Sequence, residues 1–360
     1  MSRALIVHHA GPGVTVQDLG RPGYLAFGLS QGGAADRIAM EEGAALLAQS
    51  GDHPALEMAG MGGEFEATED MRIALTGAPM RASIGGTRIA WNASHRLLKG
   101  ARLSIGAAEA GVYGYLHLGG GIETPTLLRK RSAHLAAGLG SSVAPGDRLL
   151  IGEDRKDETG LVLRPEERLG GGTVRIVPSL QTALFSPDAI ERFQSTTFQR
   201  DARGNRMGVR LVSDGAGFDS KEGLSVLSEV IVPGDIQITG DGTPFVLQSE
   251  CQTTGGYPRI GSVLPADLSR VAQTRPGEYL RFTFVTLDEA VTVQRRARDV
   301  RKSLRTSLTP LIRDPSTIPD LLSYQLVSGA TAGDDIEQWS LTPNDDLDAS
   351  EGLRPWKIGR

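Results

Sequence analysis

A short turn-and-strand unit recurs four times in the 360-residue chain, twice in each half. Its copies begin at Lys99-Gly100, Pro145-Gly146, Pro233-Gly234 and Pro276-Gly277, and each runs straight into an apolar segment. Glycine adopts the positive φ that tight turns require, and alternating apolar segments are typical of half-buried strands. The repeat therefore predicts a turn-rich β protein with two related halves.

Composition supports this interpretation, because the chain has 46 glycines and 19 prolines but only 5% aromatic residues. Apolar runs bounded by turn residues predict strands over residues 4–8, 72–76, 88–91, 103–105, 113–118, 149–151, 174–177, 236–239, 244–248 and 279–285. We expect a mainly β fold with two β-barrel-like domains, divided near the polar stretch Glu153–Gly172.

Three segments have a helical pattern. Asp36–Gln49 begins with a residue suited to an N-cap, with Ile38, Ala45 and Leu46 on one face, and Pro187–Phe193 follows a capping serine. The third begins with the capping box Thr286-Leu-Asp-Glu289, and apolar residues follow it at helical spacing. The charged residues at the C-terminus, interrupted by prolines, predict a peripheral tail.

The charge balance and the missing motifs exclude several classes of protein. A net charge of −5 argues against a nucleic-acid binder, and a single cysteine excludes an internal disulfide. The sequence has no apolar run of membrane-spanning length, no signal peptide, no Walker-type phosphate loop and no histidine spacing typical of zinc. We expect a cytoplasmic protein with no membrane partner and no metal.

The first of three segments rich in glycine and polar residues spans residues 13–36. Gln17 lies at the end of an extended stretch, and Asp18 and Arg21 are near enough to pair. The pattern fits either a salt-bridged turn or a glycine-lined site for a polar ligand.

The second segment is Gly204–Leu211, in which Asn205 and Arg206 offer amide and guanidinium donors for a carboxylate or phosphoryl oxygen. A turn stabilised by Asn205 is the alternative. The third segment, Gln248–Pro258, follows an apolar strand. Its Gly255 and Gly256 predict a backbone anion nest. Glu250 is either a functional carboxylate or a surface ion-pair partner, and Cys251 is predicted to be a small buried residue rather than a nucleophile.

Two long motifs, Thr15–Tyr24 and Gln252–Pro258, resemble the biotin-dependent carboxyltransferase family, also called allophanate hydrolase subunit 2. Asn205–Leu211, Ser228-Glu229, Gly234–Gln237 and Gln273–Gly277 follow in the family's order. The resemblance implies tandem cyclophilin-like β-barrel subdomains over residues 1–160 and 170–287, with a C-terminal helix and tail over 288–360. Among family members, the chain most resembles those that serve as the C subunit of 5-oxoprolinase.

That resemblance implies ATP-dependent hydrolysis of the lactam 5-oxoproline to glutamate, with subunit-A-like and subunit-B-like partners and an ATP site that we do not place. Carried onto this chain, it predicts Asp18, Arg21 and Glu250 as catalytic. The predicted substrate-binding residues are Gln17, Asn205, Arg206, Arg210, Gln252, Thr253, Thr254, Gly255, Gly256 and Tyr257.

Two alternatives stay open. One is biotin-dependent carboxyl transfer to urea or a related amide, with biotin carried on another chain because no Met-Lys-Met motif occurs here. The other is a non-catalytic regulator that binds a subunit-B-like partner. The chain also departs from the family pattern at Leu128–His134, at Gly204-Asn205 and at Glu250. These departures leave the exact substrate open.

Overall fold

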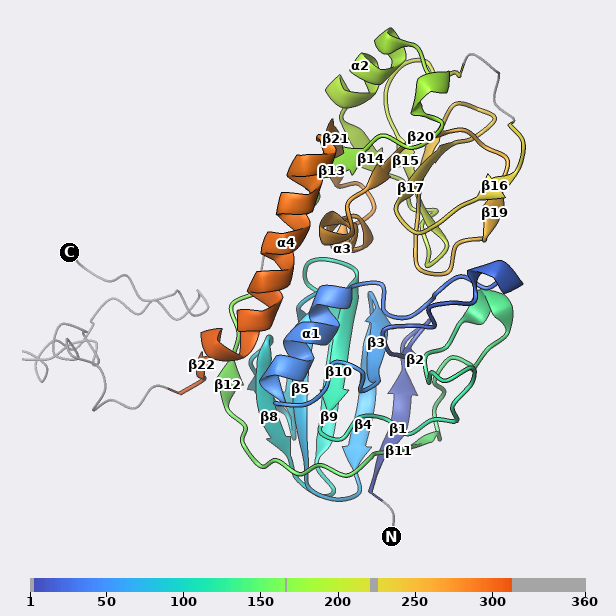
Figure 1. The fold of residues 1–360 in the computed structure, drawn as a ribbon. Helices are drawn as coiled ribbons and strands as arrows, with labels where there is room; N and C mark the ends of the chain where they lie inside the picture. Colours follow the sequence, from blue (N-terminus) through green and yellow to red (C-terminus); the bar gives the residue numbers. More distant parts are fainter. Residues whose placement is uncertain (1–2, 166, 221–225, 313–360) are drawn as a thin grey trace, which may run out of the picture. The chain divides into compact units, whose positions relative to one another are not determined.

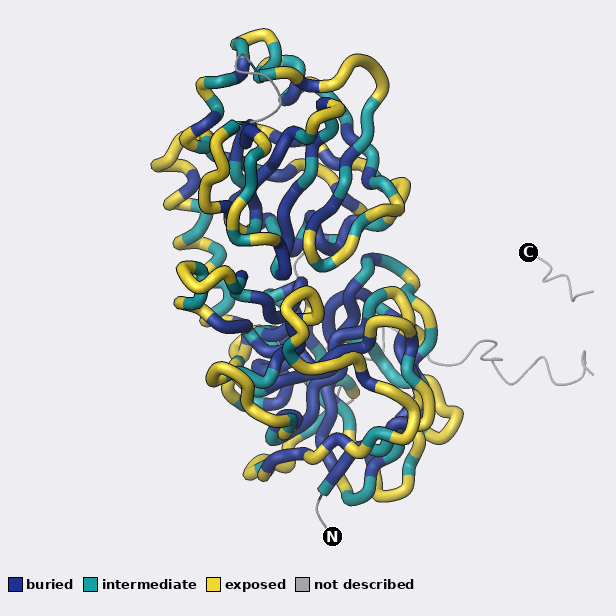
Figure 2. The backbone as a smooth tube through the Cα atoms, turned by 90° about the vertical axis from the view of Figure 1, so that its right-hand side faces the viewer, coloured by how far each residue is buried: buried dark blue, intermediate teal, exposed yellow. Residues whose placement is uncertain are grey.

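Two β-sheets and a closed β-barrel make up most of the structure, a computed structural model that describes residues 3–165, 167–220 and 226–312 (Figure 1). The chain through Ile312 forms one compact unit. Figure 2 shows that the strands are largely buried while many connecting turns are exposed. The mainly β class predicted from the sequence is confirmed.

The two sheets are built mainly from the N-terminal part of the chain, and one strand from near residue 310 joins the second sheet. The first has the order β11-β1-β4-β9-β6-β7, with β1 (Ala4–Ala10), β4 (Gly63–Ala67), β6 (Met80–Ile84), β7 (Thr87–Ile89), β9 (Arg102–Ala108) and β11 (Arg148–Leu150). The second has the order β2-β3-β10-β5-β8-β12-β22, with β2 (Thr15–Gln17), β3 (Ala55–Ala59), β5 (Met71–Gly77), β8 (Ala93–Leu97), β10 (Tyr113–Leu118), β12 (Leu161–Val162) and β22 (Thr309–Pro310). Leu5 and Phe65 from one sheet share a buried core with Leu75 and Leu116 from the other. The sheets therefore pack face to face.

The barrel closes in the order β13-β20-β17-β18-β15-β14-β21. Its strands are β13 (Gly172–Val177), β14 (Phe198–Arg200), β15 (Gly208–Val212), β17 (Asp235–Ile238), β18 (Pro244–Leu247), β20 (Arg259–Val263) and β21 (Tyr279–Phe284). The ring of Phe193 lies 5.0 Å from that of Phe198 and 5.3 Å from that of Phe282, so aromatic packing fills the interior. A separate two-stranded ladder pairs β16 (Glu229–Val230) with β19 (Thr254–Gly255).

Four α-helices lie among the described residues: α1 (Arg37–Leu46), α2 (Pro187–Ser195), α3 (Pro265–Gln273) and α4 (Leu287–Ser303). The predicted N-caps Asp36 and Ser186 and the capping box Thr286–Glu289 all form. The sequence pattern missed α3, whose N-cap Leu264 makes no side-chain capping bond. Within α1, Ala45 and Leu46 of the predicted apolar face are buried and Ile38 is half-buried, and Ala39 and Met40 are buried beside them.

The repeated turns are confirmed. Gly100, Gly146, Gly234 and Gly277 have φ of +74°, +93°, +99° and +89° and precede β9, β11, β17 and β21. Of the two predicted barrel-like halves, only the second is a closed barrel in the described chain, and the first is a pair of sheets. The cyclophilin-like character and the subdomain boundaries stay predictions, and the tail beyond residue 312 lies outside the described residues.

Candidate functional site

Arg206 joins the barrel to the N-terminal sheets from the turn before β15. Its Nε donates to Oε1 of Glu250 at 2.6 Å, and its Nη1 donates to Glu57. Its Nη2 donates to the carbonyl oxygen of Gly33 at 2.6 Å. Glu57 lies on β3, whereas Glu250 follows β18 of the barrel. One guanidinium therefore links three segments that are far apart in the sequence.

Glu57 extends this link into the N-terminal sheets. Its Oε2 accepts from the hydroxyl of Tyr115 at 2.7 Å and from the backbone N–H of Ala35 at 2.8 Å. Burial disfavours the charged guanidinium, but Glu57 and Glu250 outweigh that cost and raise the pKa of Arg206. Burial, with the charge of Glu57, also holds the pKa of Tyr115 well above its ordinary value. The phenol therefore keeps its proton and donates to the carboxylate.

Glu250 faces a buried histidine on its other side. Its Oε2 accepts from the backbone N–H of Ala136 at 3.2 Å and lies 3.9 Å from Nδ1 of His134. That Nδ1 accepts from Ala137 N–H at 3.3 Å, so the ring proton is on Nε2, which donates to Ser30 Oγ at 2.9 Å. Burial lowers the pKa of His134, which favours a neutral ring. The group Arg206, Glu57, Glu250, Tyr115 and His134 is called the Arg206 cluster below.

A second link between the barrel side and the sheets runs through Gln273 at the end of α3. Its Nε2 donates to Asp36 Oδ2 at 2.8 Å, and its Oε1 accepts from the backbone N–H of Tyr113 at 2.9 Å. Asp36 also accepts from Arg168 at 2.7 Å. These contacts hold the N-terminus of α1 in place beside the Arg206 cluster.

The structure places the predicted residues Gln17, Asp18 and Arg21 together under the segment 127–134. Asp18 accepts from the backbone N–H groups of Gly20, Arg131 and Ser132 at 2.7, 2.8 and 3.3 Å. Arg21 donates to the carbonyl oxygens of Leu127, at 3.1 Å, and Ser132. The salt-bridged turn, one of the two alternatives for residues 13–36, does not form among the described residues, because Asp18 and Arg21 each bond the segment 127–134 instead.

The predicted residues of the second segment do not lie together in one site. Arg206 is central to the cluster, but Asn205 is exposed and caps its own turn by accepting from Met207 N–H at 2.8 Å. Arg210 pairs with Asp201 at 2.9 Å and with Asp241 at 3.4 Å. The turn-stabilising alternative for Asn205 therefore fits its geometry.

The third predicted segment runs along the β16–β19 ladder. Gly255 pairs with Glu229, and neither Gly255 nor Gly256 has a positive φ, so the backbone lacks the alternation that a nest uses. Gln252, Thr254 and Tyr257 are exposed and Thr253 is half-buried. Ligand binding by this segment stays a prediction.

Cys251 is buried against Ile231 and Leu247. Burial raises the pKa of its thiol to about 12. A thiol that stays protonated is a poor nucleophile, which agrees with the predicted structural role.

Sequence reasoning missed Glu57, Tyr115, Ser30 and the role of His134. A single acid within the apolar run Ala55-Leu-Glu-Met-Ala59 was a usable signal, because a buried carboxylate needs a partner. The partner itself had no local signal, since Arg206 is 149 residues away.

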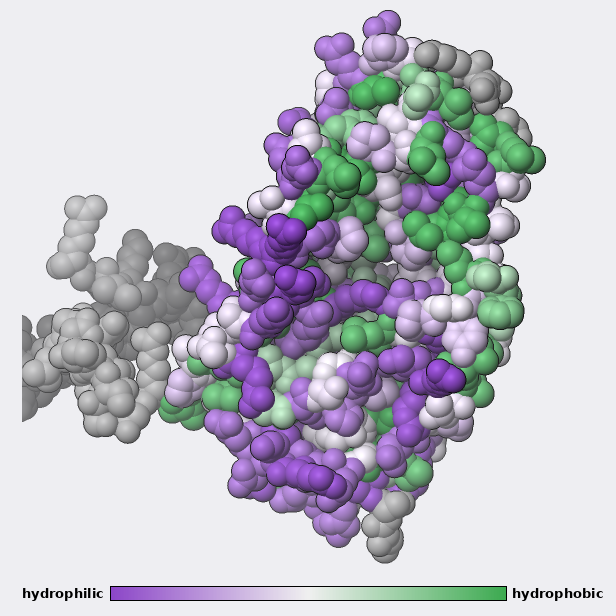
Figure 3. Space-filling view, viewed as in Figure 1, coloured by the Kyte–Doolittle hydropathy of each residue, from purple (hydrophilic) through white to green (hydrophobic). Residues whose placement is uncertain are grey.

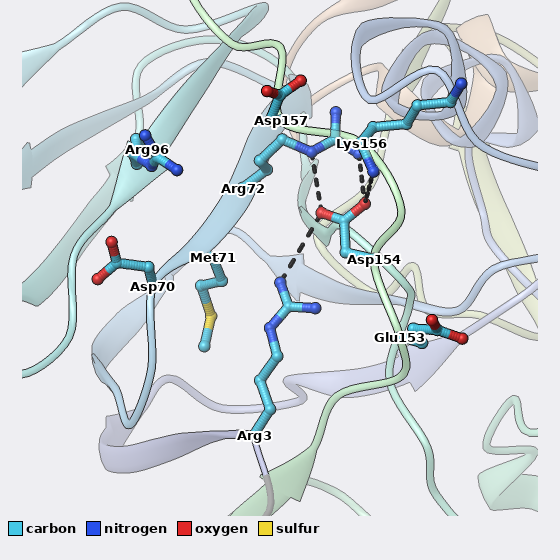
Figure 4. Close-up of a pocket in the computed structure, with 9 residues that line it drawn as sticks. All are labelled: Arg3, Asp70, Met71, Arg72, Arg96, Glu153, Asp154, Lys156 and Asp157. Carbon is cyan, nitrogen blue, oxygen red and sulfur yellow. Dashed lines mark hydrogen bonds and ion pairs between the residues drawn. The ribbon is translucent and has the colours of Figure 1, made fainter.

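Two surface cavities lie elsewhere. One of about 350 Å³ is lined by Arg3, Arg72, Asp154 and Lys156 among others (Figure 4). Burial opposes ionisation of Asp154, yet hydrogen bonds from Arg72 lower its pKa, so these two groups are engaged with each other. The second, about 450 Å³, runs along α4 between Val177, Leu264 and Val291.

Within the described ranges, no group of His, Cys, Asp and Glu side chains is arranged to hold a metal ion. No helix in the described part of the chain has the length and apolarity needed to cross a bilayer.

Comparison with known proteins places these residues in a family. The model "Carboxyltransferase domain, subdomain A and B" matches residues 27–284. The chain is 31% identical to the C subunit of 5-oxoprolinase from Haemophilus influenzae over 78% of this chain and 91% of the relative. It is 32% identical to the C subunit of 5-oxoprolinase from Escherichia coli, over 80% and 93%. The urea amidolyase of Lachancea kluyveri is 24% identical, and the match covers 80% of this chain but 17% of that protein.

Solved structures give the same grouping. The crystal structure of TTHA0988 superposes with a TM-score of 0.73 at 29% identity, over 78% of this chain and 56% of that one. The urea amidolyase of K. lactis superposes with a TM-score of 0.76 at 23% identity, over 87% of this chain and 21% of that one. At that identity the second likeness supports the fold alone.

Proposed function

Because the chain belongs to the family of carboxyltransferase domains, subdomains A and B, and is homologous to the C subunit of 5-oxoprolinase, we propose that it serves as that subunit in an ATP-dependent 5-oxoprolinase. The reaction opens the lactam of 5-oxoproline to glutamate. The observation that carries the proposal is the buried contact of Arg206 with Glu250, in a chain that matches more than nine tenths of two such C subunits.

Glu250 is the general base in this proposal. Arg206 holds Oε1, while Oε2 has one backbone hydrogen bond of 3.2 Å and so keeps capacity to accept a proton from water. Every nitrogen of Arg206 is engaged with Glu57, Glu250 or Gly33. Arg206 is therefore a positioning residue that fixes the orientation of the carboxylate.

ATP supplies the phosphoryl group that makes the lactam carbon a better electrophile. The sequence has no Walker-type loop to cradle phosphates, so the contacts of ATP come at least in part from partner proteins in this proposal. The two relatives are named as C subunits, which supports subunit-A-like and subunit-B-like partners. We expect the assembly to be cytoplasmic.

Exposed apolar side chains support a protein partner. Phe27 is 82% exposed and Leu227 is 87% exposed, and Val230 and Tyr257 are also exposed. Figure 3 shows hydrophobic residues gathered around β16 and β19. Apolar surface of this kind is typical of interaction sites.

The test is reconstitution of the chain with subunit-A-like and subunit-B-like proteins, followed by measurement of glutamate formed from 5-oxoproline with ATP. Glu250→Gln is expected to lower kcat by about 10²–10⁴-fold, the usual contribution of a general base. Glu109→Gln is the control, since Glu109 pairs with Arg81 at the surface, outside both the barrel and the Arg206 cluster, and is expected to leave kcat within about twofold.

Carboxyl transfer from carboxybiotin to urea is assayed in parallel. Transfer to urea without glutamate formation would replace the proposed reaction with the carboxyltransferase alternative. Neither activity, together with retained binding of a partner, would support the regulator alternative.

A further inference from the structure

Three buried side-chain atoms under the segment 127–134 have no hydrogen-bond partner. They are Nη1 of Arg21, Oγ of Ser132 and Oε1 of Gln17. All three residues are at most 1% exposed. Buried polar atoms are almost always paired, so three unpaired atoms in one place indicate a missing group. These residues are called the Arg21 cluster.

The three residues share one short stretch of backbone. Arg21 donates to the carbonyl oxygen of Ser132, and Gln17 Nε2 donates to that of Ala133 at 3.1 Å. Because the carbonyl of Ala133 needs a donor, the amide of Gln17 is oriented with Oε1 as its free acceptor. The cluster thus offers two kinds of donor, guanidinium and hydroxyl, and one amide acceptor.

The charge of Arg21 is also uncompensated. Its hydrogen bonds go to neutral carbonyls, and no ion pair among the described residues includes it. By contrast, the buried Arg72 pairs with Asp154, and Arg206 pairs with two glutamates. Burial lowers the pKa of Arg21, and Asp18 and Glu250 offset this only in part. A buried cation without a counter-ion is costly, and a bound anion would remove that cost.

The electrostatic surroundings favour a single negative charge. Asp18 and Glu250 both act on Arg21 through space, and Arg21 acts on His134. These two carboxylates repel a phosphate dianion more strongly than a carboxylate. The interaction with Glu250 also places the Arg21 cluster beside the Arg206 cluster.

We propose that the Arg21 cluster binds the carboxylate of a cyclic amino-acid lactam, through Arg21 Nη1 and Ser132 Oγ, while Gln17 Oε1 accepts from the lactam N–H. The inference rests on the proposed function, because 5-oxoproline carries a carboxylate next to its lactam N–H and urea carries none. It makes Arg21 and Ser132 the residues that select a lactam acid over a neutral amide.

The turn that covers Arg21 is suited to open for such a ligand. Leu127 and Leu128 are exposed, and the non-glycine residues Leu128 and Arg129 have φ of +51° and +65°. Side chains rarely adopt this conformation, so the closed turn is strained. Displacing it would release Nε of Arg21 from the carbonyl oxygen of Leu127.

The experiment measures binding of 5-oxoproline, 2-pyrrolidinone and inorganic phosphate to the assembly with its partner proteins, by calorimetry. 2-Pyrrolidinone is the same lactam without the carboxylate. We expect it to bind the wild type at least tenfold more weakly than 5-oxoproline. Arg21→Met is expected to weaken the binding of 5-oxoproline by 10- to 100-fold and to leave the affinity for 2-pyrrolidinone unchanged.

Ser132→Ala is the second variant, and it avoids the risk of misfolding. Its Oγ has no partner in the free protein, so its removal breaks no hydrogen bond. We expect unchanged or higher thermal stability together with three- to tenfold weaker binding of 5-oxoproline. Arg200→Met is the matched control, because Arg200 is also buried and bonds only carbonyl oxygens, those of Ala272 and Thr274. It is expected to leave both affinities unchanged.

The outcomes separate the two proposals. If 5-oxoproline does not bind the wild-type assembly, both the proposed function and this inference fail. If it binds but Arg21→Met and Ser132→Ala leave its affinity unchanged, or weaken both lactams equally, only the inference fails. Phosphate that competes with 5-oxoproline and loses affinity in Arg21→Met would reassign the cluster to a phosphoryl group.

Discussion

Arg206 and Arg21 are both largely buried guanidinium groups that bond distant segments, yet their partners differ. Arg206 is held by Glu57, Glu250 and one carbonyl oxygen. Arg21 is held by two carbonyl oxygens and keeps Nη1 unpaired. The first arrangement neutralises its own charge and is complete without a ligand. The second leaves both a charge and a donor free.

This difference separates a structural link from a candidate binding group. Substituting a buried charged side chain that has partners lowers the stability of the protein, because those partners are then left unpaired in the interior. An unpaired one costs stability in the free protein, and at Arg21, whose neighbours Ser132 and Gln17 also have unpaired atoms, a bound ligand explains its retention. We therefore expect substitutions of Arg206 to act mainly on folding and substitutions of Arg21 mainly on binding.

The largest effect is expected for Arg206→Met. Glu57 and Glu250 are 1% and 3% exposed and would lose their shared cation. Stranding buried charges costs about 3–5 kcal/mol, to be measured by urea unfolding. The double variant Arg206→Met/Glu57→Gln is expected to recover part of that loss. A cost below about 1 kcal/mol would show that the Arg206 cluster is not a structural link.

Asp18→Asn is expected to have the next largest effect. The carboxylate accepts three backbone N–H groups, whereas an amide has only one oxygen and would face some of them with its own donors. The loss is about 2 kcal/mol of unfolding free energy, typical of hydrogen bonds to a charged group. Asp241→Asn, at an exposed position, is the control. Unchanged stability in Asp18→Asn would mean that the segment 127–134 is held in another way.

Arg21→Met is expected to cost less than about 1 kcal/mol, although Arg21 is more deeply buried than Arg206. Loss of two bonds to carbonyl oxygens is offset by removal of an uncompensated buried cation. The same urea titration, without ligand, gives the comparison with Arg206→Met. If the two variants destabilise equally, the contrast between the clusters fails.

The parts of the fold that sequence analysis predicted are those fixed by local chemistry. The capping box at Thr286 and the N-cap Asp36 concern contacts within three residues, and the turn glycines such as Gly234 need only a positive φ. The missed strands β3 and β20 have turn residues at both ends but lack a continuous run of β-branched and aromatic residues, since their sequences are Ala-Leu-Glu-Met-Ala and Arg-Ile-Gly-Ser-Val. Helix α3 was missed because its N-terminus has no side-chain cap.

Sequence analysis selected several residues of the candidate site but did not predict the contacts that they make. Asp18, Arg21, Arg206 and Glu250 were all selected, and all are at least largely buried near the boundary between sheets and barrel. Of the two alternatives for the first segment, the salt-bridged turn does not form, because Asp18 bonds backbone 113 residues away instead of Arg21. Such contacts depend on how the sheets and barrel pack, and local patterns carry no information about that.

The smallest effect concerns His134, the member of the Arg206 cluster on which Arg21 acts through space. Burial lowers its folded-state pKa below the ordinary value of about 6.5, so the unfolded chain binds a proton more readily. Its contribution to stability is therefore complete above pH 6.5 and is lost as the pH falls through the folded-state pKa. Because of His134, we expect the free energy of unfolding of the wild type to fall by less than about 1 kcal/mol between pH 7 and 5.5. His134→Gln is expected to make the free energy of unfolding less dependent on pH over this range. His8→Gln, at the surface beside Glu66, is the control. A wild type that gains stability on acidification would mean that protonated His134 pairs with Glu250 strongly enough to overcome burial, and the Arg206 cluster would then hold two cations rather than one.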